Sequence, residues 1–192
     1  ARARGDELSA LTRIDGSPPA IAATSAQAKQ FVIVCPQTAA RSWGSRLLRA
    51  QLAALIEELC ADSAQPVINR RQVLLSGASM GGDGVWTMAA SRPDLFAALV
   101  PVCAAANVTA VPAIGEKPIW IFHGTHDAVV PIEAADTMAA ALRATGDAQL
   151  KYTRLDECPT PPGVPHAEAH AAWVPAFDET SELWEWLLKQ TL

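Results

Sequence analysis

The sequence has no cluster of basic residues, and its 15 lysines and arginines are outnumbered by 20 aspartates and glutamates, for a net charge of −5. Nucleic-acid binding draws on concentrated positive charge, so this balance argues against a DNA- or RNA-binding protein. No apolar run approaches the about 18 residues that a membrane-spanning helix needs. The sequence therefore predicts neither a nucleic-acid partner nor a membrane span.

The motifs of metal and cofactor sites are also missing. The four cysteines lack C-x-x-C spacing, which argues against a zinc site, and we interpret them as buried free thiols, with a disulfide left open. Gly82 is followed by Asp83, not by the Lys-Ser/Thr of a phosphate-binding loop. The pair Gly82 and Gly84 is followed by Thr87 instead of the third glycine of a dinucleotide fingerprint. We therefore expect no metal ion and no organic cofactor.

The 192 residues are enough for one domain with a proper core, and half of them are apolar. We see no internal repeat and no second domain, so residues 1–192 are interpreted as a single unit. The sequence begins at Ala1, without a methionine or a signal-like segment. We interpret this start as the result of upstream residues that were removed, processed or not included.

Short, continuously apolar runs alternate with helical patterns. Runs of this kind are typical of strands that are covered on both faces of a parallel sheet. They lie at 31–34, 73–76, 98–102 and 119–122, with a weaker candidate for an edge strand from 150. Amphipathic helices are predicted at 43–59, from 79 to near 93, at 133–144 and in the final segment. The alternation predicts an α/β fold with a mostly parallel sheet of about five strands flanked by helices. Residues 158–175 hold five prolines without periodicity and predict a loop.

Residues 77–81 match the pattern G-x-S-x-G around Ser79. The motif follows an apolar run and opens a helical pattern, so Ser79 is predicted at a strand-to-helix turn. There a strained backbone lifts the hydroxyl clear of the sheet, and Gly77 and Gly81 keep side chains from colliding. The Met80 amide then lies at a helix N-terminus, aimed where an oxyanion would form. Ser79 is the predicted nucleophile; the alternative is a glycine-rich turn without catalysis.

A serine nucleophile needs a base to take its proton and a carboxylate to orient that base. In α/β folds that carry the serine at such a strand-to-helix turn, the order along the chain is serine, acid, histidine. Asp127 follows the run at 119–122 in a loop and is the predicted acid, whereas its competitor Asp136 lies within a helical pattern.

Four histidines are candidates for the base. His123 and His126 flank the turn before Asp127 and are interpreted as loop hydrogen-bonding groups. His166 and His170 both lie in the proline-rich loop before the last helix, where the base is expected, and spacing alone does not separate them.

Several segments together resemble the α/β-hydrolases, from Gly5 to the C-terminus, and specifically the esterase and predicted-peptidase branch near the phospholipase–carboxylesterase and feruloyl-esterase-like groups. They are VCPQ, LLSGASMGGDGVW, PDLFAALVPVC, KPIWIFHGTHDAVVP and HAAWVPAF. The family's sequence pattern around its catalytic base resembles His-x-x-Trp followed by a proline. His170, Trp173 and Pro175 match this pattern, although Ala169 stands where the family usually has glycine. The resemblance thus favours His170 over His166.

The resemblance implies a cofactor-free serine esterase that acts on small carboxylic esters through an acyl-enzyme. It places Gln37 and Trp43 near the mouth of the site, and Trp173 as a wall of the pocket. The alternative interpretation is that Gln37 is a polar group of a loop and that the two tryptophans are packed aromatic residues. Peptide hydrolysis is the runner-up activity. A catalytically impaired hydrolase scaffold that serves in binding is the alternative from another class.

The resemblance also implies that a part is missing. The family's HG-x-G loop, which supplies a second oxyanion donor, does not occur, and the opening ARARGDEL resembles the tail of that loop. In the family the third strand lies between the strands that 31–34 and 73–76 would form, and residues 1–30 hold no apolar run to replace it. Three outcomes remain: 31–34 pairs directly with 73–76, another chain supplies the strand, or the sequence is truncated. Direct pairing would leave an exposed apolar surface that favours a homo-oligomer.

Overall fold

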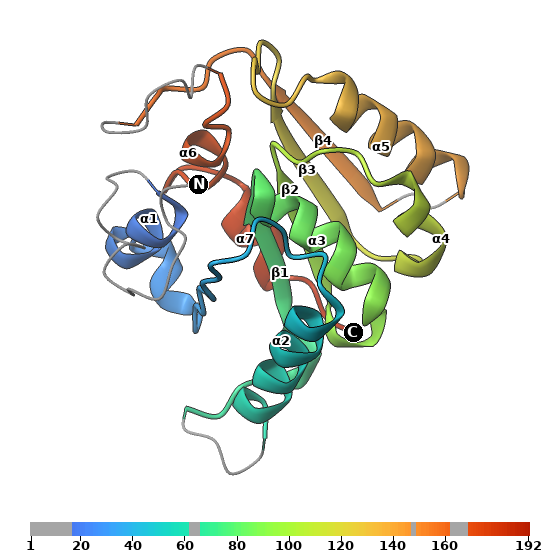
Figure 1. Cartoon of the computed structure of the whole chain (residues 1–192). Coiled ribbons are helices and arrows are strands. Elements are labelled where there is room, and N and C mark those ends of the chain that lie inside the picture. Colours follow the sequence, from blue (N-terminus) through green and yellow to red (C-terminus); the bar gives the residue numbers. More distant parts are fainter. Residues whose placement is uncertain (1–16, 62–65, 147–148, 162–168) are drawn as a thin grey trace.

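The computed structural model describes residues 17–61, 66–146, 149–161 and 169–192 (Figure 1). At its centre is a four-stranded sheet in which every neighbouring pair is parallel and the strand order follows the sequence. The strands are β1 Leu74–Ala78, β2 Ala98–Val102, β3 Ile119–Gly124 and β4 Leu150–Leu155. In the described part of the chain, β1 and β4 are the two edges of this sheet.

Helices cover both faces of the sheet. The α-helices are α1 Pro18–Thr24, α2 Arg46–Leu59, α3 Met80–Ser91, α4 Val111–Ile114, α5 Glu133–Ala144, α6 Trp173–Ala176 and α7 Leu183–Leu188. Short 3-10 helices are η2 Gln27–Gln30, η3 Arg70–Gln72, η4 Pro93–Leu95 and η5 Val108–Ala110. Alternate strand residues point to opposite faces: Leu99 and Ile121 pack with α3, α4 and α5, whereas Val100 and Phe122 pack with α6 and α7. Because both faces are buried, β2 and β3 are apolar at nearly every position.

Most of the predicted elements are confirmed. The apolar runs from 73, 98 and 119 form β1, β2 and β3, and the candidate edge strand from 150 is β4. The helix after Ser79 ends at Ser91, before Pro93, and the other predicted helices are α2, α5 and α7. The predicted loop at 158–175 differs in one respect, because the helical turn α6 begins at Trp173; residues 162–168 lie outside the described part.

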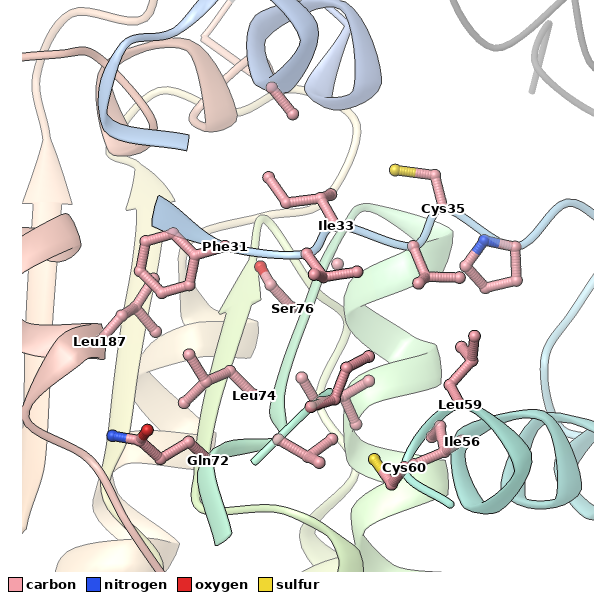
Figure 2. Close-up of a pocket in the computed structure, with 18 of the residues that line it drawn as sticks. Phe31, Ile33, Cys35, Ile56, Leu59, Cys60, Gln72, Leu74, Ser76 and Leu187 are labelled. Atoms are coloured by element: carbon pink, nitrogen blue, oxygen red, sulfur yellow. The ribbon is translucent and has the colours of Figure 1, made fainter. Parts of the chain in front are cut away.

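The prediction of a strand at 31–34 is wrong, and of the three outcomes left open, direct pairing of this segment with β1 is not found in the described residues. Residues 32–38 have no regular structure, and Val32, Ile33 and Val34 are 54%, 43% and 48% exposed. A strand forms only where a neighbouring strand satisfies its backbone groups, and a cavity separates this segment from β1 (Figure 2). The described sheet accordingly has four strands instead of about five.

Candidate active site

Ser79 occupies a strained turn between β1 and α3. Its φ of 55° and ψ of −120° lie in a region that non-glycine residues rarely adopt, and its amide donates to the Val102 carbonyl at 2.9 Å. The turn needs glycine at position 77, because a Cβ there would lie 2.2 Å from the Gly81 carbonyl oxygen. A Cβ at Gly81 meets no atom within 4 Å in the described structure, so the steric requirement that the motif predicts for both glycines applies to Gly77 alone.

Three predicted residues from distant parts of the sequence meet at this turn. The Ser79 Oγ lies 2.9 Å from the His170 Nε2, and the His170 Nδ1 lies 2.7 Å from the Asp127 Oδ2. A carboxylate only accepts hydrogen bonds, so we assign the imidazole proton to Nδ1, which leaves Nε2 free to accept from the serine hydroxyl. His170 and Asp127 are both buried, and the pair is therefore shielded from water.

The competing residues do not reach this turn or are not described. Asp136 lies on α5, where its carboxylate accepts from the Tyr152 hydroxyl at 2.9 Å and pairs with Arg154 at 3.2 Å. His126 is exposed in the turn after β3. His166 lies outside the described residues.

Asp127 is held as a carboxylate by donors on several sides. Its Oδ1 accepts from the amides of Val129 and Val130 at 2.8 and 2.9 Å, while its Oδ2 faces His170. Burial by itself raises the pKa of this carboxyl, but the hydrogen bonds from His123, His170 and the two amides outweigh burial and hold its pKa well below the ordinary value. The group that orients His170 is therefore ionised at neutral pH.

His123 is closer to the site than the sequence indicated. It lies in β3 itself and is fully buried, with Nε2 2.8 Å from the Val130 carbonyl oxygen and 3.4 Å from the Asp127 Oδ2. Because a carbonyl only accepts, we assign the proton to Nε2, which bridges the strand to the Asp127 loop. The spacing of four residues between His123 and Asp127 was a sequence signal for this contact, but the turn after β3 is what brings the two side chains together.

A cavity of about 320 Å³ opens beside the nucleophile. Its lining includes Ser79, Met80, Gln37 and Trp43. The role of Gln37 and Trp43 near the mouth of the site stays a prediction. The Trp43 ring packs against α3, where a Cβ at Gly84 would come within 2.9 Å of it.

Trp173 lies next to His170, and its role as a wall of the pocket stays a prediction. It is not among the residues that line the cavity at Ser79. Its ring is buried and meets the His170 imidazole edge to face, with centroids 5.8 Å apart at 89°. Trp173 therefore supports the imidazole by packing.

Within the described ranges, no group of three or more His, Cys, Asp or Glu side chains could hold a metal ion. The four cysteines, all within the described part, are free, and three of them are buried. Among the described helices, none is both long and apolar enough to cross a bilayer.

Comparison with solved structures decides the fold. The structure is similar to that of a thermostable esterase, with a TM-score of 0.78 and 27% identity over 98% of this chain. The fold is that of an α/β-hydrolase. A second α/β-hydrolase neighbour, an Arabidopsis thaliana SOBER1 variant, matches 74% of this chain and 62% of its own at a TM-score of 0.53 and 17% identity. This chain spans 52% of the length of the thermostable esterase. No family model and no curated protein matches the sequence.

Proposed function

We propose that this α/β-hydrolase chain carries the catalytic centre of a serine esterase that cleaves small carboxylic esters. One observation carries the proposal: the continuous hydrogen-bonded series from Ser79 through His170 to Asp127, set on a strained strand-to-helix turn at the edge of a cavity. Structural similarity to an esterase at 27% identity supports the same class of activity.

In the proposed reaction, the Ser79 Oγ attacks the ester carbonyl while the His170 Nε2 takes the hydroxyl proton. Asp127 stabilises the imidazolium that forms, since its carboxylate faces the Nδ1 at 2.7 Å. The tetrahedral intermediate collapses, the imidazolium protonates the leaving alkoxide, and an acyl-Ser79 ester remains. His170 then removes a proton from water, which attacks this ester, and Ser79 recovers its proton as the acid departs.

The Met80 backbone N–H is our proposed donor to the oxyanion. Met80 is the first residue of α3, where amides point away from the helix and the helix dipole favours negative charge. We assign no second donor within the described residues. Loss of one such donor typically lowers turnover by about 10²–10³, so we expect the 192-residue chain to be a slow esterase.

The one-donor assignment also favours esters over peptides. An amide has a poorer leaving group and requires more stabilisation of its tetrahedral intermediate and better acid catalysis than an ester. Peptide hydrolysis by the same three residues is therefore the second candidate. A role in binding alone has less support, because the hydrogen-bonded series would then have no use.

Hydrolysis of p-nitrophenyl acetate, together with labelling by a fluorophosphonate, tests the proposal. We expect hydrolysis above background and one label per chain, both lost in Ser79→Ala. The matched control is Ser91→Ala, because Ser91 lies exposed at the end of α3, where its hydroxyl hydrogen-bonds to Met88 and to no other described residue. If Ser79→Ala hydrolyses the ester as fast as the parent, or if the parent shows no activity and no labelling, the proposal is wrong.

A further inference from the structure

His123 is a buried polar residue that the proposed reaction does not use. The four positions of β3 before it, from Ile119 to Phe122, are apolar and buried, and His123 itself is 0% exposed. Its Nδ1 has no hydrogen-bond partner among the described residues. A buried polar group without a partner costs stability, so its presence in a native core calls for an explanation. The contacts of the other ring nitrogen supply one.

The Nε2 of His123 ties the turn around Asp127 to the sheet. It donates to the Val130 carbonyl at 2.8 Å, and in the part of the chain that the structure describes no other hydrogen bond joins residues 128–130 to β3. Packing adds little to this hold, because the Val129 side chain is 54% exposed. The position of these three residues relative to β3 therefore depends on His123.

The same turn holds the Asp127 carboxylate. Oδ1 of Asp127 accepts from the amides of Val129 and Val130 at 2.8 and 2.9 Å. Oδ2 lies 2.7 Å from the His170 Nδ1 and 3.4 Å from the His123 Nε2. Val130 is thus fixed on both sides, by its carbonyl to His123 and by its amide to Asp127. The contact of His123 with Oδ2 is long, so its main effect on the carboxylate runs through Val130.

We propose that His123 is a positioning residue of the active site. Through the Val130 carbonyl it fixes the turn that orients Asp127 toward His170. The effect on turnover rests on the proposed esterase activity, whereas the effect on the hydrogen bond between Asp127 and His170 does not. His123 does not line the cavity at Ser79. Its loss should therefore lower kcat and leave KM unchanged.

Two substitutions separate the N–H of His123 from its bulk. His123→Leu fills a similar volume without a donor. His123→Gln places an amide N–H as many bonds from Cβ as the imidazole Nε2. We expect His123→Leu to lower kcat for p-nitrophenyl acetate and the rate of fluorophosphonate labelling by about 10-fold to 100-fold, the range for one lost hydrogen bond to a charged group or a shift under about 1 Å. His123→Gln should restore most of the loss.

The matched control is His126→Leu, the same change at an exposed histidine of the same turn, which should keep the parent rate. Each variant must show a cooperative urea transition. If His123→Leu does not fold, His123→Asn takes its place. The amide of asparagine lies one bond closer to the backbone and does not reach the Val130 carbonyl, so His123→Asn should lose the same factor.

A double-mutant cycle distinguishes positioning from an unrelated structural role. If His123 acts through Asp127, its removal costs nothing once Asp127 no longer orients the base. Labelling of the double variant His123→Leu/Asp127→Asn, followed over hours, should therefore proceed at the rate of Asp127→Asn alone. Independent roles would multiply the two losses.

A proton NMR spectrum tests the geometry without any substrate. A histidine Nδ1–H that donates to a buried carboxylate resonates far downfield, and His170→Gln assigns this signal by removing it. We expect the signal in the parent chain and in His123→Gln, and its broadening or loss in His123→Leu. A parent chain that neither hydrolyses the ester nor takes the label would refute the proposed function, and this spectrum would still decide the role of His123.

Three results would overturn the proposal. In the first, folded His123→Leu or His123→Asn turns over and is labelled at the parent rate. In the second, the losses of His123→Leu and Asp127→Asn multiply in the double variant. In the third, the downfield signal of His170 is unchanged in His123→Leu.

Discussion

Replacement of Gly124 by alanine should disable the site although Gly124 touches none of the reacting atoms. Gly124 is the last residue of β3, and a Cβ there would lie 1.9 Å from the Ala169 carbonyl oxygen, where contacts under 3.0 Å are essentially never seen. The two must separate by about 1.1 Å or more. The strand is held in place by pairing with β4 and by the hydrogen bond that the Thr125 amide donates to the Leu155 carbonyl, so the 169–170 segment moves instead.

That movement displaces the proposed base. Ala169 directly precedes His170, whose Nδ1 and Nε2 lie 2.7 and 2.9 Å from their partners. A misplacement of about 1 Å can lower a rate by about 100-fold, which is about 3 kcal/mol in the barrier. We expect Gly124→Ala to lose about that factor in kcat/KM for p-nitrophenyl acetate and in the rate of fluorophosphonate labelling.

The control is Gly81→Ala, the same chemical change at a position where the Cβ meets no described atom within 4 Å. Its losses should be far smaller than those of Gly124→Ala. Both variants must show a cooperative urea transition, so that lost activity is not mistaken for unfolding. A folded Gly124→Ala that is labelled and turns over at the parent rate would refute the reasoning that this glycine positions His170.

Three more outcomes are expected. Gly77→Ala, with a Cβ 2.2 Å from the Gly81 carbonyl oxygen, should abolish fluorophosphonate labelling, whereas labelling at the parent rate would mean that the turn relaxes freely. Asp127→Asn should destabilise the chain at pH 7 in urea unfolding. Because the folded pKa of Asp127 is lowered, its contribution is present above the unfolded pKa of about 3.9 and is lost as the pH falls below it, so the difference between the two proteins should shrink there; a gap that is constant from pH 7 to pH 3 would contradict this. Leu99→Ala, at a fully buried position of β2, should cost about 2–5 kcal/mol in the free energy of unfolding, and a loss under about 1 kcal/mol would show that the core closes around the cavity.

Ser79 and Asp127 were accessible from the sequence because their signals are local. Ser79 stands in a short motif between an apolar run and a helical pattern, and Asp127 follows an apolar run in a turn. The choice of His170 over His166 came from the resemblance, and the structure brings His170 to 2.9 Å from Ser79. The contacts of His123 with Val130 and Asp127 could not be predicted from the sequence, because they depend on how the turn after β3 folds back onto the strand.

The sequence by itself determined the succession of strands and helices, since continuous apolar runs and amphipathic periods report burial within one element. Tertiary structure decided what depends on a partner. The 31–34 segment has the composition of a strand but does not form one. A strand requires hydrogen bonds to a neighbouring strand, and a cavity separates this segment from β1. The same applies to Gly77 and Gly124, whose lack of a side chain matters only because another stretch of backbone passes within 3 Å of where a Cβ would be. Local pattern encodes which side chains are buried, and only the folded chain determines what they meet.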